Sequence, residues 1–140
     1  MVLQRWQSVF LLIAAIVMGF YTFSTIATLT VAGVASEVSM LGGSMMWGFM
    51  VVSVLCALLA VVTIFKYRTL KLQRRLCLIG AGITAALLAS LLIVVCNIEC
   101  DTMSLGWSNV LPVVAIVANV LAYRGITHDL KILSSYDRIR

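Results

Sequence analysis

Four long apolar stretches alternate with short polar segments along this chain of 140 residues. The apolar stretches cover residues 9–34, 45–65, 76–95 and 107–123. A helix of about 20 residues crosses the roughly 30 Å hydrocarbon core of a bilayer. The pattern therefore predicts an all-α integral membrane protein, with residues 1–140 forming one four-transmembrane-helix bundle.

The segment between the second and third stretches is too charged to lie inside a membrane. Five of its side chains are cationic: Lys66, Arg68, Lys71, Arg74 and Arg75. Each would cost about 2.5–3.5 kcal/mol at the membrane centre. The segment must therefore reach water, and the second and third stretches form a helical hairpin.

The charges also predict an orientation. All ten Lys and Arg residues fall at Arg5, in the 66–75 loop or in the 124–140 tail, whereas the opposite connections carry acidic side chains. Cytoplasmic flanks of membrane helices are enriched in Lys and Arg. We therefore expect both termini and the middle loop to be cytoplasmic. Trp47 and Trp107 would then lie at the outer membrane interface, where tryptophan is common.

The first stretch needs a separate test because it resembles a signal peptide. It follows Arg5 and contains the small residues of a cleavage site at 33–35, but its apolar run is about twice the usual length. We expect a retained helix that tilts or protrudes. Its hydroxyls can bond to carbonyls of the same helix, and the residues concerned are Thr22, Ser24, Thr25, Thr28 and Thr30.

Composition agrees with a membrane protein and argues against a nucleic-acid-binding one. The chain is 63% hydrophobic and only 11% charged, whereas soluble domains are about 25% charged. Its net charge of +5 comes from residues beside apolar spans, without the interleaved aromatics of a nucleic-acid surface. Membrane lipids are the expected surroundings, and nucleic acid is not an expected partner.

Few residues suggest chemistry, so no catalytic group, metal or cofactor is expected. His128 is the one histidine, and it lies in the basic tail. The apolar stretches contain no charged side chain, which argues against a proton-coupled transporter. Asn119 is the most polar side chain deep in a stretch, and we expect it to form a hydrogen bond between helices.

The four cysteines fall into two groups. Cys56 and Cys77 are expected to pack and to stay reduced. Cys96 and Cys100 lie at the outer end of the third stretch, where they could form a disulfide if that segment is not helical. Their spacing and the lack of a second pair differ from the membrane thiol oxidases that work with quinones, so redox catalysis is not expected.

Small residues recur every fourth position in the third stretch, at Gly82, Ala86 and Ser90. This spacing lets two helices approach closely. The seam is therefore expected to pack inside the bundle, and the alternative is packing against another protein.

The tail has an amphipathic pattern. Ile126, Leu130 and Leu133 follow helical spacing, and basic residues lie between them. A cytoplasmic helix is expected to continue from the fourth stretch. It would lie on anionic lipid head groups, or alternatively serve as a docking surface for a partner.

Three segments resemble one family when they are taken in order. The opening at 3–9 (LQRWQSV), the loop at 67–77 (YRTLKLQRRLC) and the end at 137–140 (DRIR) are similar to the "iQRiQtvyL", "nRkLqlRLc" and "DRlR" segments of that family. It is a domain-of-unknown-function group of small four-helix membrane proteins, seen mainly in Bacteroidetes. One departure is Asp129-Leu130, where the family often has paired acids.

The resemblance implies a location in the bacterial inner membrane but no activity. It directs attention to polar residues at the cytoplasmic face as candidates for docking a partner or lipid. These candidates, together with a neighbouring arginine, are Gln4, Arg5, Arg68, Gln73, Arg74, Arg75, Asp137 and Arg138.

Three functional interpretations follow. The favoured one is a non-enzymatic accessory, scaffold or assembly subunit of a larger envelope complex, because the chain is small, lacks catalytic groups and carries its distinctive residues on one face. The alternatives are a small oligomeric transporter and a membrane thiol or quinone redox protein. A larger membrane complex or a homo-oligomer is the expected assembly.

Overall fold

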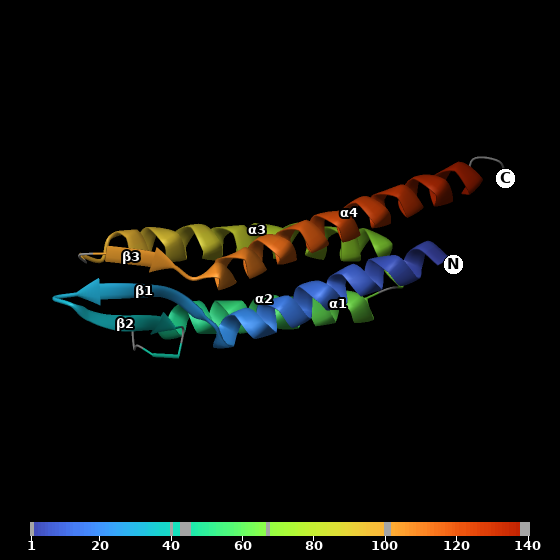
Figure 1. The fold of residues 1–140 in the computed structure, drawn as a ribbon. Helices are drawn as coiled ribbons and strands as arrows, with labels where there is room; N and C mark the ends of the chain where they lie inside the picture. The colour runs from blue at the N-terminus through green and yellow to red at the C-terminus, as the bar shows by residue number, and fades with distance from the viewer. Residues whose placement is uncertain (1, 40, 43–45, 67, 100–101, 138–140) are drawn as a thin grey trace.

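The computed structural model describes residues 2–39, 41–42, 46–66, 68–99 and 102–137, with side chains from Trp6 to Ser135 within those ranges. Four helices run alongside one another, and a small sheet extends beyond them at one end (Figure 1). We refer to this end as the sheet end. The opposite end, where α1 begins, α2 and α3 are connected and α4 ends, is the basic end.

The helices confirm the predicted four-helix architecture. They are α1 (Val2–Phe23), α2 (Trp47–Phe65), α3 (Leu70–Cys96) and α4 (Val110–Asp137). All four are long and apolar enough to cross a membrane, as in a multi-pass membrane protein. α3 begins six residues before the predicted position 76, because helical hydrogen bonding can continue from the apolar core into polar sequence.

The predicted first helix over residues 9–34 is wrong in its second half. α1 ends at Phe23, and the following segment is the strand β1 (Thr25–Val31). β-branched residues dominate this strand, and they favour extended backbone. Thr22 and Ser24 do bond to helix carbonyls, at Met18 and Tyr21. The remaining hydroxyls expected to do so, Thr25, Thr28 and Thr30, lie in β1.

The sheet adds an element that the all-α prediction did not contain. β1 lies between β2 (Val34–Ser39) and β3 (Thr102–Leu105), and both pairings are antiparallel. Ala32 and Gly33 form the turn of the β1–β2 hairpin with positive φ angles of 51° and 80°. Two left-handed residues in a two-residue turn match the twist of the strands they join.

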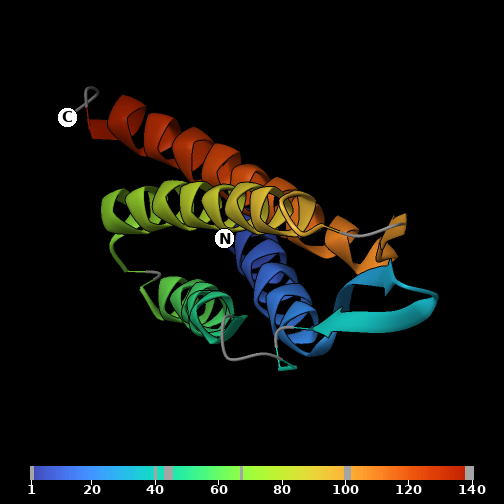
Figure 2. The same ribbon diagram turned by 90° about the vertical axis from the view of Figure 1, so that its left-hand side faces the viewer.

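The four helices form a ring of neighbours in which α1 contacts α2 and α4, and α3 contacts the same two helices. Viewed from the sheet end, the β1–β2 hairpin projects beside α1 and the start of α4 (Figure 2). The main core joins the helices to β1, and it includes Met18, Tyr21, Ile26, Leu91 and Ala118. The sheet is therefore anchored in the same core as the bundle.

A second core cluster explains what happens to the tail. α4 continues unbroken through residue 123 to Asp137, as the amphipathic pattern predicts. Its first apolar position, Ile126, is fully buried with Leu11 of α1 and Cys77 of α3. Leu133 remains exposed. The first turns of the tail therefore pack on the chain's own helices, and only its last turns have an apolar face free for lipid or a partner.

Candidate functional site

Polar side chains inside the bundle hold helices together. The hydroxyls of Thr22 and Ser53 lie 2.9 Å apart across α1 and α2, and both residues are buried. Asn119 donates to the Ala115 carbonyl at 2.9 Å, and this hydrogen bond lies within α4, whereas the prediction was a bond between helices. Its side chain instead lies against Gly80 of α3, where an added Cβ would be 3.5 Å from its Oδ1.

The small-residue seam does not face the bundle interior. Gly82 and Ala86 are exposed and Ser90 is half-buried, whereas Leu87 and Leu91 point into the core. A Cβ added at Gly82 would meet no atom within 4 Å. The expectation that the seam packs inside this bundle is therefore wrong. The helical period puts Gly80, Thr84 and Leu87 on the inward face of α3 and the seam outside it.

A hollow lies beside the seam, between α2 and α3. It measures about 550 Å³, and apolar groups form almost all of its surface. The residues that line it are Gly48, Phe49, Val52, Ile83, Ala86, Leu87 and Ser90. The seam and the hollow together form one surface, which we call the α2–α3 face. It combines close access to the α3 backbone with room for side chains from another molecule.

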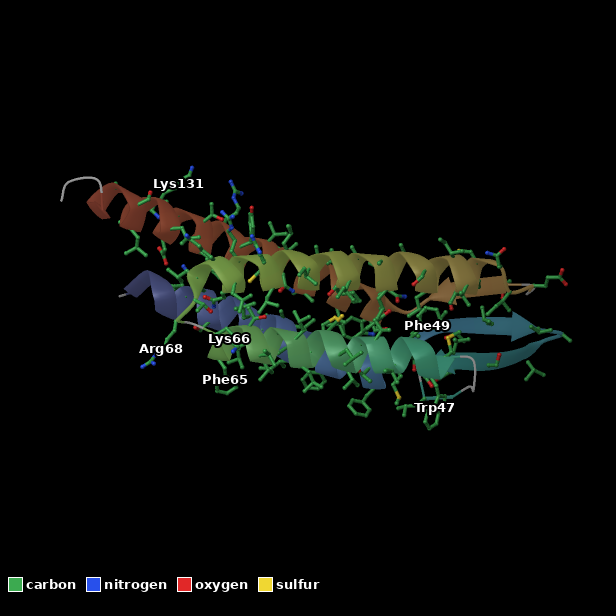
Figure 3. The ribbon with its side chains drawn as sticks, turned by 180° about the vertical axis from the view of Figure 1, so that it is seen from behind. Trp47, Phe49, Phe65, Lys66, Arg68 and Lys131 are labelled. Atoms are coloured by element: carbon green, nitrogen blue, oxygen red, sulfur yellow. The ribbon has the colours of Figure 1, made fainter. Side chains whose placement is uncertain are left out.

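Basic side chains gather at the basic end, as the charge pattern predicts. Lys66 and Arg68 lie at the α2–α3 connection and Lys131 on α4, at the end opposite Trp47 (Figure 3). Arg68, Lys71 and Arg75 are exposed, and Arg74 is half-buried. The guanidinium groups of this end are therefore available to a partner or to lipid head groups.

The other residues predicted for docking are either buried or lie outside the side chains that the structure describes. Gln73 is buried, at 2% exposure, so it cannot contact a partner and we exclude it from the docking surface. Gln4, Arg5, Asp137 and Arg138 fall outside the side chains that the structure describes. The predicted pairing of Asp137 with an arginine therefore remains a prediction.

A contact that the sequence analysis missed joins the first and last helices. The buried Gln7 side chain donates to Asp129 Oδ2 at 2.5 Å. Gly125 faces this pair, and a Cβ there would lie 3.0 Å from Gln7 Cγ. Asp129 therefore helps to fix α4 against α1. The departure at Asp129-Leu130 was the only sequence signal that pointed to this position.

The three cysteines that the structure describes lie where the sequence places them. Cys56 and Cys77 are buried, and Cys96 is exposed at the end of α3. Cys100 lies outside the described residues, so its pairing with Cys96 is still a prediction.

The junction at the sheet end was also missed. The Asn109 side chain donates to the carbonyls of Ile26 and Gly106, at 2.8 and 3.0 Å, and accepts from the Tyr21 hydroxyl at 3.1 Å. Ser108 donates to the Thr25 carbonyl. Short polar side chains before a helix often serve as caps, but their binding to a strand about 80 residues earlier has no local sequence signal.

Comparison with known proteins gives one family match. A family model described as "Domain of unknown function (DUF4293)" matches residues 3–139. No curated protein and no solved structure matches the chain.

Proposed function

This chain belongs to the DUF4293 family, and from that premise we propose that it is a non-enzymatic accessory or assembly subunit of a larger protein complex in the bacterial inner membrane. The exposed α2–α3 face carries the proposal. Both termini and the basic loop would face the cytoplasm, following the distribution of Lys and Arg.

The α2–α3 face is unusual for a surface covered only by lipid. Other outward positions of the same helices include large apolar residues such as Leu55, Leu58 and Ile93. Lipid tails solvate apolar surfaces without favouring one side chain over another, so helix association depends on close packing. Small residues at Gly82 and Ala86, beside a hollow of about 550 Å³, favour the packing of a transmembrane helix from another molecule.

Charge favours a different protein over a second copy as that partner. The polar segment at the basic end of the α2–α3 face, residues 66–75, includes the first turns of α3 and carries five cations and no acidic residue. Two copies that meet through this face in the same membrane orientation would place these basic segments side by side, and like charges repel. A partner with acidic groups at that level would instead pair with the arginines.

Gly82→Leu should separate the chain from its partner without unfolding it. The new side chain would fill the seam from an exposed position, where a Cβ has no neighbour within 4 Å outside its own stretch of helix, so the fold has room for it. We expect co-purification of a partner from mild detergent to fall at least tenfold. A photo-crosslinking amino acid at Ala86 should give a single adduct with the same partner, which Gly82→Leu removes.

Two glycine variants serve as controls for this test. Gly19→Leu places the same group in a smaller hollow of about 190 Å³ between α1 and α2, away from the α2–α3 face, and should leave the partner bound. Gly80→Leu points inward, where a Cβ would already be 3.2 Å from Leu59, so it should destabilise the bundle by about 1–3 kcal/mol. If Gly82→Leu keeps the partner, or dissociates a homo-oligomer instead, the proposed partner is wrong.

The basic end offers a second test of the same proposal. Arg74→Lys combined with Arg75→Lys keeps the charge and therefore the membrane orientation, but it removes two planar guanidinium groups that bind carboxylates through paired hydrogen bonds. We expect weaker partner recovery with normal membrane insertion. Lys66→Arg with Lys71→Arg is the matched control and should change neither. If the Arg74→Lys, Arg75→Lys variant recovers as much partner as the wild type, these arginines only set the membrane orientation and do not bind the partner.

A further inference from the structure

A groove at the sheet end, separate from the α2–α3 face, combines an apolar wall with a polar rim. Its volume is about 560 Å³. Val17 and Phe20 of α1 and Leu111 of α4 form the wall, and the exposed Trp107 stands at its edge. The wall belongs to membrane-compatible helices, whereas the rim belongs to the ends of those helices and to the sheet. This arrangement suits an amphiphile with its chain along the helices and its head group at the strands.

Four hydroxyl side chains line the groove, those of Ser24, Thr25, Thr28 and Ser108, and three of them donate their protons within the protein. Ser24 donates to the Tyr21 carbonyl at 2.9 Å, Ser108 donates to the Thr25 carbonyl, and Thr25 donates to Glu37 Oε2 at 3.2 Å. A hydroxyl has one proton and two lone pairs. These three oxygens therefore offer mainly acceptors to a ligand.

The charge of the groove also favours a ligand that donates hydrogen bonds. Glu37 is the only charged residue among the described residues that line the groove, and its side chain is exposed. A carboxylate beside hydroxyl acceptors repels anionic groups and attracts cations that carry hydrogen-bond donors. A primary ammonium has three such donors. A quaternary ammonium has the charge but no N–H, so the hydroxyl acceptors do not bind it.

From this geometry we propose that the groove binds a membrane lipid whose head group ends in a primary ammonium, as in phosphatidylethanolamine. The ammonium would lie at Glu37 and the rim hydroxyls, and one acyl chain would follow Phe20 and Leu111. The site would hold the sheet end at a fixed depth in the bilayer. The proposal is independent of any protein partner, because it uses other residues at the opposite end of the molecule from the basic loop.

Native mass spectrometry of the purified chain can test the proposal, with phosphatidylethanolamine, phosphatidylcholine and phosphatidylglycerol of identical acyl chains added in equal amounts. We expect the first lipid to be retained at least about fivefold more than either of the others. Glu37→Gln should remove most of this preference, a loss of about fivefold, which is the upper range for an exposed ion pair. Glutamine keeps an oxygen acceptor for the Thr25 hydroxyl, so the local structure is preserved.

Glu99→Gln is the matched control, because Glu99 is exposed near the same end but does not line the groove. It should retain the wild-type preference. Equal retention of the three lipids, a preference for phosphatidylglycerol, or a Glu37→Gln variant that behaves like the wild type would each overturn the proposal.

Discussion

Replacing Gly106 by alanine is expected to destabilise the protein more than the same change at any other glycine that the structure describes. A Cβ at this position would lie 2.7 Å from the Thr25 carbonyl oxygen and 2.9 Å from that of Ile26. Both atoms belong to the backbone of β1, which is anchored in the core and cannot move like the end of a side chain. Gly106 itself has ordinary angles, φ −63° and ψ 138°, so the requirement is for space.

The cost should be about 3 kcal/mol, the upper range for an overpacked site that forces backbone to shift. The Gly106 N–H also donates to the Ile26 carbonyl at 2.8 Å, and a shift would strain this bond too. Thermal unfolding in detergent measures the effect. Gly48→Ala is the matched control, because its Cβ meets no atom within 4 Å and helix propensity favours alanine. Equal stability of the two variants would contradict the close packing at Gly106.

Asn109→Asp should have the second largest effect on stability. The change keeps the shape of the side chain but removes the amide group that donates to two carbonyls, those of Ile26 and Gly106. A carboxylate would face those same oxygens and repel them. Each lost hydrogen bond in a membrane protein contributes about 0.6–1.7 kcal/mol, so we expect a loss of about 2–3 kcal/mol by unfolding in detergent.

Tyr21→Phe provides the comparison for Asn109. It removes only the hydroxyl that donates to Asn109 Oδ1, and it should cost about 1 kcal/mol or less. If Asn109→Asp is no more harmful than Tyr21→Phe, the two carbonyl contacts contribute little. The double variant would then measure how strongly the two side chains depend on each other.

These two positions matter because the junction supports the proposed lipid groove. Gly106, Ser108 and Leu111 line the groove, and Asn109 fixes the segment that carries them against β1. A variant that loosens the junction should weaken lipid retention as well as stability. Glu37→Gln should affect retention alone, because Glu37 is exposed.

The sequence alone determined the number of membrane helices and which segments share an end. Both conclusions follow from free-energy costs of individual segments in a membrane, which are the same for any packing of the helices. About 20 apolar residues are needed to cross the hydrocarbon core, and five cations cannot remain within it. The loop at 66–75 and both termini therefore had to meet at one end, whatever the packing.

Tertiary structure decided where the first apolar stretch changes from helix to strand. It also decided which face of each helix points into the bundle. Hydropathy does not distinguish a buried strand from a buried helix. β1 follows α1 without a polar break, and it needs partners from β2 and from β3, about 75 residues later. The β-branched residues and Gly33 were the available local signals of the hairpin.

The faces of α3 illustrate the same limit at single residues. Gly80 and Gly82 are two positions apart in a sequence of small residues, yet a Cβ added at Gly80 would contact Leu59 and Asn119, whereas one added at Gly82 would contact no neighbouring helix within 4 Å. Only the placement of α2 and α4 around α3 makes that distinction. The contacts of Gln7 with Asp129 and of Asn109 with β1 likewise join residues more than 80 positions apart, because packing brings together groups whose pairing leaves no periodic pattern in either segment.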